Sequence, residues 1–182
     1  MASAAAHLPI ERVEVYGVSV PLVGEGFRNA YATKTTQKSA VVRLVASDGT
    51  VGLGNIDPSP GYSVETIEQS LAALRDRLAP RVKGLDAGNP HVVVRAMDEA
   101  MAGYLDAKAA IEMACVDMLS RHLGIPVHQY LGGALASELR FNAWIGILPP
   151  DEAAAEARKW FDRGFRSAKV KVGGGIHADR DR

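Results

Sequence analysis

The spacing of apolar residues changes along this chain, and that change constrains the fold more than any other feature. Residues 10–22 alternate apolar with polar side chains, and residues 40–46 and 51–56 form two further apolar runs. Both patterns are typical of strands. Ser47-Asp48-Gly49-Thr50, between the second and third runs, favours a tight hairpin turn. The sequence therefore predicts that a three-stranded antiparallel sheet opens the chain.

After residue 62 the apolar residues recur at helical spacing. Ser63 is the expected N-cap of a first helix, which Pro80 is expected to end. Residues 90–101 predict a second helix. A third is expected to be capped by Asp106 and stopped by Gly124. The middle of the chain is thus predicted to be helical.

Two residues on the apolar face of the third helix have chemistry of their own. Cys115 is the single cysteine, which excludes an internal disulfide. Its place on the apolar stripe favours a small buried side chain over a nucleophile. His122 extends the same stripe, which favours a core or boundary histidine over a metal ligand.

The last part of the chain has the pattern strand, helix, strand. Residues 139–148 are strand-like, residues 150–164 predict an alanine-rich helix, and residues 165–172 predict a second strand. Such a βαβ unit implies parallel strands with a right-handed crossover. The glycine pair within Leu131-Gly132-Gly133-Ala134-Leu135-Ala136 favours a domain boundary just before this unit.

Lys169 and Lys171 lie two residues apart on the final strand, so both side chains should point to the same face. Their Cα atoms would be roughly 6.5–7 Å apart. At an effective dielectric of about 20, two ammonium groups at that separation repel by about 2.5 kcal/mol. That repulsion favours loss of one proton, which would make a base. The spacing alone favours the alternative, an edge strand whose lysines face water and discourage further sheet pairing.

Composition excludes several classes of function. The 182 residues are 47% hydrophobic, as in a globular protein with a buried core, and 21 basic residues balance 21 acidic ones. No global field therefore attracts nucleic acid or an anionic membrane. Residues 1–9 lack the pattern of a secretory leader, and no run is long enough to span a bilayer. We expect a cytoplasmic protein, and its charge does not indicate what it binds.

The order of these segments resembles the mandelate racemase and muconate lactonizing enzyme branch of the enolase superfamily. The resemblance also rests on Pro126–Gly133, which has the pattern Pro-Val-x-x-x-Leu-Gly-Gly, on Ala109–Met118, and on Lys-Val-Lys at residues 169–171. It implies an α+β capping domain over residues 1–136, made of the three-stranded sheet and helices. Residues 137–182 would then be the first βαβ unit of a (β/α)₈ TIM-type barrel that is incomplete in this chain.

The resemblance also implies a reaction. In this family a lysine removes the proton α to a substrate carboxylate, and Mg²⁺ stabilises the enediolate, giving a racemase or epimerase, a cycloisomerase or a dehydratase. A lysine or histidine base that acts together with magnesium is the general pattern of the superfamily. By position, Lys171 aligns with the base and Lys169 with an auxiliary lysine. A homo-oligomer is also expected.

The family places two capping loops over the substrate, and by position these are residues 24–36 and 55–62. Within them Tyr31, Asp57 and Tyr62 are the expected substrate-binding side chains. Asp57 precedes Pro58, so simple turn chemistry is an equal alternative. Trp144, on the first barrel strand, is expected either to line the pocket or to fill the barrel.

The chain departs from the family in length. A barrel of this type takes about 250 residues, but only the last 46 of the 182 residues follow Ala136. The family's Mg²⁺ ligands lie on later strands, so no metal site is expected in this chain. We expect it to be the inactive N-terminal part of a longer isomerase or lyase. The alternative is a non-catalytic binding or assembly module. Nucleotide binding at residues 170–175 is disfavoured, because the glycines lack phosphate-loop spacing.

Overall fold

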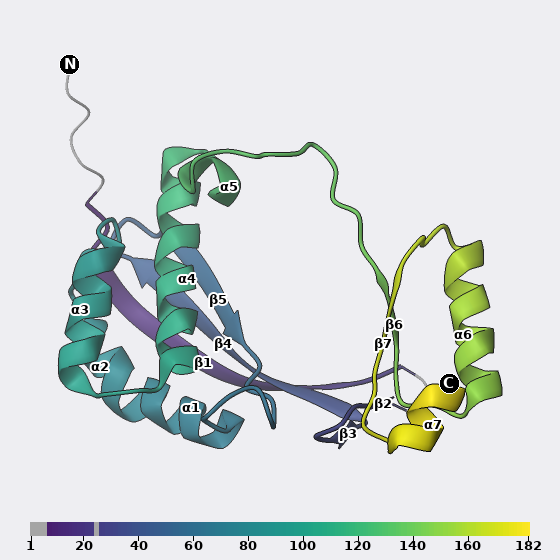
Figure 1. Cartoon of the computed structure of the whole chain (residues 1–182). Helices are drawn as coiled ribbons and strands as arrows, with labels where there is room; N and C mark the ends of the chain where they lie inside the picture. The colour runs from purple at the N-terminus through teal and green to yellow at the C-terminus, as the bar shows by residue number, and fades with distance from the viewer. Residues whose placement is uncertain (1–6, 24–25) are drawn as a thin grey trace. The chain divides into compact units, whose positions relative to one another are not determined.

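The structure is a computed structural model that describes residues 7–23 and 26–182 (Figure 1). Its contacts divide the chain into two compact units. The first unit comprises the described residues up to Ser19 together with Lys38–Ala134, and the second comprises Val20–Gln37 and Leu135–Arg182. The expected division between residues 136 and 137 follows chain order and stays a prediction. The contacts add residues 20–37 to the C-terminal unit.

The first unit contains the predicted sheet. Its strand order is β1-β4-β5, with β1 at Ile10–Pro21, β4 at Thr36–Ala46 and β5 at Val51–Ile56. Strands β4 and β5 pair antiparallel, from Ala40 opposite Ile56 to Val45 opposite Val51. Gly49, in the connecting turn, has φ 85°, a conformation that favours glycine. The three-stranded sheet is therefore confirmed.

Helices cover one face of this sheet (Figure 1). Helix α1 is followed directly by the π-helical turn η1 and by α2, and three further helices follow in the described part of this unit. Their bounds are α1 Ile67–Ala73, η1 Leu74–Leu78, α2 Ala79–Val82, α3 Pro90–Ala100, α4 Leu105–Leu123 and α5 Val127–Tyr130. None of the helices in the described part of the chain is long and apolar enough to cross a bilayer.

Three predicted helix ends are wrong. Thr66, rather than Ser63, caps α1, because Thr66 and Gln69 form a reciprocal capping box. Pro80 does not end the helix. It lies in the first turn of α2, directly after the π-helical turn, where its missing N–H is tolerated, and the helix continues to Val82.

The third wrong end is the start of α4. Its N-cap is Tyr104, which has left-handed backbone angles, rather than Asp106. The Asp106 amide lies within the first turn and donates a hydrogen bond of 2.8 Å to the Glu65 carboxylate. The side chain of Glu65, which precedes α1, therefore caps α4. No sequence pattern near the start of α4 predicts this contact. The predicted stop at Gly124, with φ 68°, is confirmed.

Helix α4 packs against β5 at very short range. A Cβ atom added to Gly52 would lie 2.0 Å from the carbonyl oxygen of Ala114, and one added to Gly54 would lie 1.8 Å from that of Ala110. Cys115, the next residue of α4 after Ala114, is fully buried, and burial raises the pKa of its thiol to about 12. The thiol is therefore a packing group, as expected. His122 lies at the boundary, 3.4 Å from the Asp48 carboxylate.

The second unit contains the predicted βαβ unit. Strands β6 (Ala143–Ile145) and β7 (Ala168–Val170) pair in parallel, and α6 (Pro150–Asp162) connects them. Both strands are shorter than expected. Helix α7 spans Ile176–Asp181. The segment expected to be a loop, residues 24–36, contains a hairpin of β2 (Phe27–Arg28) and β3 (Thr33–Lys34). Residues 24 and 25 lie outside the described residues.

We expect Gly54→Ala to lower the free energy of unfolding of the first unit by at least about 1–3 kcal/mol, the usual cost of overpacking. The added methyl group can fit only if α4 moves away from β5. Urea unfolding should be followed by circular dichroism, because both tryptophans lie in the second unit. The control is Leu53→Ala, which shortens a side chain that is 45% exposed between the two glycines. An equal loss in both variants would contradict the packing argument.

Candidate functional site

One face of the parallel pair carries the chemistry of the second unit. Trp144 of β6 is in register with Lys169 of β7, so these side chains share a face. The Lys171 amide donates a 2.9 Å hydrogen bond to the carbonyl of Ile145, which extends the pairing by one step. Lys171 therefore lies on the same face as Lys169. Ala143 and Ile145, on the other face of β6, are buried.

The Lys171 ammonium lies over the ring of Trp144, with Nζ 4.5 Å from the ring centroid. The same indole stacks on Phe27 of the hairpin, with centroids 4.6 Å apart and planes 11° apart. A backbone hydrogen bond of 3.1 Å, from the Ile147 amide to the Arg28 carbonyl, joins the hairpin to the end of β6. Together these contacts form an aromatic platform, made of Phe27 and Trp144, beneath one of the two lysines.

The tip of the hairpin is held by Asn29. Its side-chain oxygen accepts hydrogen bonds from the amides of Tyr31 and Ala32, at 2.8 and 2.9 Å. Tyr31 is 60% exposed at this tip. Ala30 lies against Gly173, where a Cβ atom would come within 2.7 Å of the Ala30 Cβ. Gly173 has φ 123°, so glycine serves both the backbone angle and the close approach.

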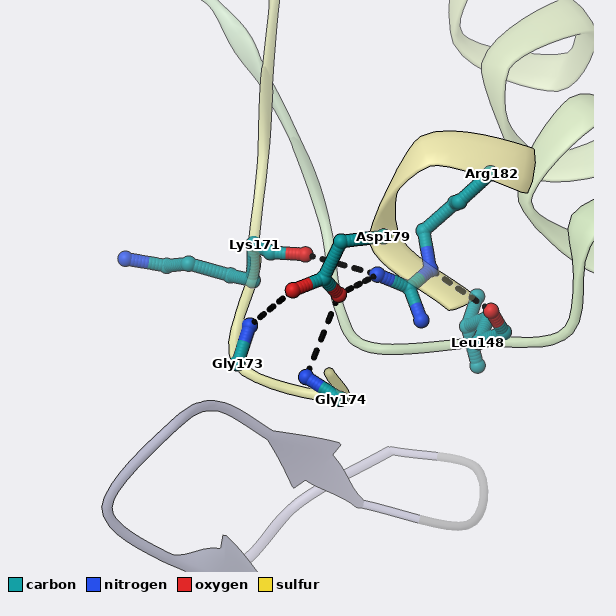
Figure 2. Close-up of polar contacts among 6 residues, drawn as sticks. All are labelled: Leu148, Lys171, Gly173, Gly174, Asp179 and Arg182. Atoms are coloured by element: carbon teal, nitrogen blue, oxygen red, sulfur yellow. Dashed lines mark hydrogen bonds and ion pairs between the residues drawn. The ribbon is translucent and has the colours of Figure 1, made fainter. Parts of the chain in front are cut away.

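A turn of three glycines follows the lysine strand, and Asp179 of α7 closes it (Figure 2). One carboxylate oxygen accepts the Gly173 amide at 2.8 Å, and the other accepts the Gly174 amide at 3.1 Å and an Arg182 nitrogen at 2.8 Å. The hydrogen bond from Gly173, followed by that from Arg182, lowers the pKa of Asp179. Asp179 is therefore ionised at neutral pH.

The remaining predicted substrate residues belong to the first unit. The backbone carbonyl of Asp57 accepts a hydrogen bond of 3.0 Å from the Ser59 hydroxyl, and the Tyr62 amide donates to the Ser59 carbonyl. Tyr62 also lines a surface hollow of about 460 Å³ beside the start of α1 and the loop before α4. The second unit thus brings Trp144 and the two lysines together on one face and also contains Tyr31, whereas Asp57 and Tyr62 lie in the other unit. The substrate-binding roles expected for Tyr31, Trp144, Asp57 and Tyr62 stay predictions.

The acidic side chains of the described residues do not form a metal centre. Among residues 7–23 and 26–182, no group of three or more His, Cys, Asp and Glu side chains is arranged to hold an ion. Asp179, the acidic residue next to the lysine strand, is engaged by two amides and a guanidinium group. These residues do not fit an octahedral Mg²⁺ site.

Sequence reasoning missed three residues of this region, namely Phe27, Asp179 and Arg182. Phe27 lies in a segment expected to be a loop, and its large aromatic side chain was the available signal, because such side chains usually pack against other residues. Asp179 lies in a stretch with the composition of a polar tail. Its position five and six residues after two glycines, whose amides need acceptors, was the available signal.

The comparisons with known proteins all match this chain to the same group of enzymes. The family model described as mandelate racemase / muconate lactonizing enzyme, N-terminal domain, matches residues 12–132. The chain is 30% identical to an L-Ala-D/L-Glu epimerase of Bacillus subtilis over 91% of this chain and 45% of that protein. It is 33% identical to muconate cycloisomerase 1 of Pseudomonas putida over 90% of this chain and 45% of that protein.

Solved structures give the same result. The N-succinyl Arg/Lys racemase of Bacillus cereus has a TM-score of 0.92 at 28% identity, over 96% of this chain and 47% of that one. A dipeptide epimerase of Enterococcus faecalis, complexed with Mg and the dipeptide L-Leu-L-Tyr, has a TM-score of 0.90 at 31% identity, over 96% and 49%. The chain thus spans about half the length of the relatives it matches.

We expect Phe27→Leu to change the environment of Trp144 and to leave that of Trp160 unchanged. Phe27 stacks on Trp144, whereas Trp160 makes its ring contact with Phe165. The indole N–H resonances of the two tryptophans in a ¹H-¹⁵N spectrum measure this directly. Phe165→Leu is the matched control and should move only the Trp160 signal. A Trp144 signal that is unmoved in Phe27→Leu would contradict the stacking.

Proposed function

The chain belongs to the mandelate racemase and muconate lactonizing enzyme family, and we propose that it supplies the base of an enzyme that removes the α-proton of a carboxylate substrate. One observation carries the proposal. Lys171 lies just past the carboxyl end of β7, on the face it shares with Lys169 and Trp144. The carboxyl ends of strands are where barrel enzymes of this architecture place catalytic residues.

In this proposal Lys171 accepts the proton from the α-carbon as a general base. Lys169 presents a second positive charge on the same face. That charge stabilises the negative charge that builds up on the substrate carboxylate as the proton leaves. Within the described residues neither lysine forms an ion pair with a carboxylate of the chain. Both charges are therefore open to an anionic substrate.

The substrate we propose is a carboxylic acid with an acidified α-position, and a dipeptide or an N-acylated amino acid is the first class to test. Relatives named as racemases and epimerases of such compounds support this choice. Cycloisomerisation is the second reaction, supported by the muconate cycloisomerase. Elimination, as in a dehydratase, is a third outcome of the same first step. Tyr31 and Trp144, together with Asp57 and Tyr62, are the proposed substrate contacts.

We include Mg²⁺ in the proposal only as a cofactor of the full-length enzyme, because the family implies it. A relative with a bound dipeptide was solved with Mg, which supports the ion for the full-length enzyme. The side chains of the described residues do not form a site for it. We therefore place its ligands outside this chain and assign no step of the reaction to the metal.

A non-catalytic binding or assembly role is the second candidate, and one observation favours it. Apolar side chains at the end of the lysine strand are open to solvent, with Val170 45% and Val172 61% exposed. Among the described residues β7 pairs with β6 alone, so its other backbone edge has no strand partner, and such an edge pairs readily with further strands. In this second function the 182 residues would join a partner rather than turn over a substrate.

For the full-length enzyme that contains this chain, we expect Lys171→Ala to abolish exchange of the substrate α-proton with deuterated solvent. Loss of a general base typically costs a factor of about 10² to 10⁴. The probes are an Ala-Glu dipeptide, N-succinyl-arginine and muconate, with exchange or turnover followed by ¹H NMR. Lys159→Ala, which removes an exposed lysine of α6 paired with Glu156, is the control and should retain activity. Unchanged exchange in Lys171→Ala would exclude Lys171 as the base.

For the 182-residue chain itself, we expect no exchange or turnover with the same probes and added Mg²⁺. The proposed base is present, but the described residues offer no ligand group for the metal. The measurement is the same NMR assay, with the full-length enzyme as the positive control. Robust activity of the purified chain would overturn the proposal that it needs further residues.

A further inference from the structure

We propose that Asp179 and Arg182 are positioning residues that fix the backbone immediately after Lys171 and so hold the Lys171 side chain over Trp144. The inference rests on the proposed role of Lys171 as a base. It concerns two residues of α7 and its end, neither of which points at the face that carries the lysines. Figure 2 shows the Lys171 side chain extending away from both of them.

Arg182 joins the carboxyl ends of the two parallel strands. Its Nε donates to the Leu148 carbonyl, beyond β6, at 2.7 Å, and its Nη1 donates to the Lys171 carbonyl, beyond β7, at 3.2 Å. The side chain is only 4% exposed. A guanidinium group so enclosed requires a negative partner. The Asp179 carboxylate, 2.8 Å away, is that partner.

Asp179 extends this link into the glycine turn. Its two oxygens accept the amides of Gly173 and Gly174, two and three residues after the lysine. Glycines have the largest conformational freedom of any residue, so an unrestrained turn here would leave the end of the strand loose. The carboxylate removes that freedom. Hydrogen bonds to an ionised acceptor are among the stronger ones in proteins.

Lys171 is therefore held at three points. Its amide bonds to Ile145, its carbonyl accepts from Arg182, and its ammonium lies on the Trp144 ring. The two backbone contacts set the direction of the Cα–Cβ bond. The contact of the ammonium with the Trp144 ring depends on that direction. Removal of Asp179 should loosen the second contact and, through it, the third.

The neighbouring Asp181 provides a matched comparison. It lies on the same helix and carries the same charge, but among the described residues its side chain pairs only with the exposed Arg180. Asp181→Ala therefore changes the net charge and the helix composition as Asp179→Ala does, without touching the glycine turn.

The experiment is NMR of the 182-residue chain, with two readouts. The first is amide hydrogen exchange at Gly173 and Gly174. The second is the ε-methylene proton resonance of Lys171, which the ring current of Trp144 shifts upfield; Trp144→Leu gives its unshifted position. Asp179→Ala should raise glycine amide exchange about tenfold or more, and should move the Lys171 resonance toward the Trp144→Leu value. Asp181→Ala should change neither.

Formate separates a carboxylate that positions Lys171 from a general loss of structure. Added sodium formate should return both readouts of Asp179→Ala toward wild type in a saturable way, whereas sodium chloride at equal ionic strength should not. Asp179→Asn keeps the size of the side chain without the charge. It is used in place of Asp179→Ala if the amides of Ala143 and Ile145 show that the strand pair has opened.

The pH profile adds a signature. The pKa of Asp179 is lowered in the folded chain, so its contribution is present at neutral pH and is lost only as pH falls through that lowered value. The Lys171 resonance of the wild type should move in that acidic range, below the ordinary range of aspartate. In Asp179→Asn the transition should be absent.

Two results would overturn the inference. Glycine amides that are freed while the Lys171 resonance stays in place would show that the turn does not position the lysine. Unchanged glycine exchange in Asp179→Ala would show that the carboxylate does not close the turn. Neither readout requires turnover. Failure of the proposed function, seen as α-proton exchange that survives Lys171→Ala, is therefore separate from failure of this inference.

Discussion

At Gly52 and Gly54, β5 lies so close to α4 that no side chain fits between strand and helix. This approach places the longest helix of the described chain directly on the sheet, and it leaves the other sides of α4 for α1 and α3. Lys108 of α4 completes the arrangement. Its nearly buried ammonium bonds to Asp98 and to the Met101 carbonyl at the end of α3, which satisfies a group that a helix end would otherwise leave open. The packing of the first unit thus depends on the close backbone contact between β5 and α4.

In the second unit, the ammonium group at the end of the long Lys171 side chain has to be held in one place. Fixing a lysine costs up to about 2 kcal/mol of rotamer freedom, and a short two-stranded pair offers few contacts to offset that cost. Lys171 has a ring beneath its ammonium, and its carbonyl is bound by a nearly buried arginine. Lys169 has neither contact among those described. This difference supports the separate roles proposed for the two lysines, because a base must be held in one place, whereas a charge that acts over several ångströms need not be.

Local patterns predicted the elements that local physics determines. Alternation predicted β1, two apolar runs joined by a turn signal predicted β4 and β5, helical spacing predicted α4, Gly124 predicted its end, and the strand-helix-strand order predicted the parallel pair. The start of α1 could have been predicted too, because Thr66 to Gln69 is a readable capping box. The start of α4 could not, since its cap is the distant Glu65. The stacking of Phe27 on Trp144 joins residues far apart in the sequence, and nothing in either segment specifies the other.

The charges of the second unit support the proposal that its lysines bind an anionic substrate. Two ammonium groups on one face would normally attract a nearby carboxylate of the same chain, and Asp179 is close along the sequence. Its oxygens are already occupied by Gly173, Gly174 and Arg182, so the negative charge is used to fix the turn. The positive charge of the lysine face therefore stays uncompensated by the ion pairs of the described residues. A substrate carboxylate would supply the missing charge, and it would meet a lysine whose backbone is already fixed.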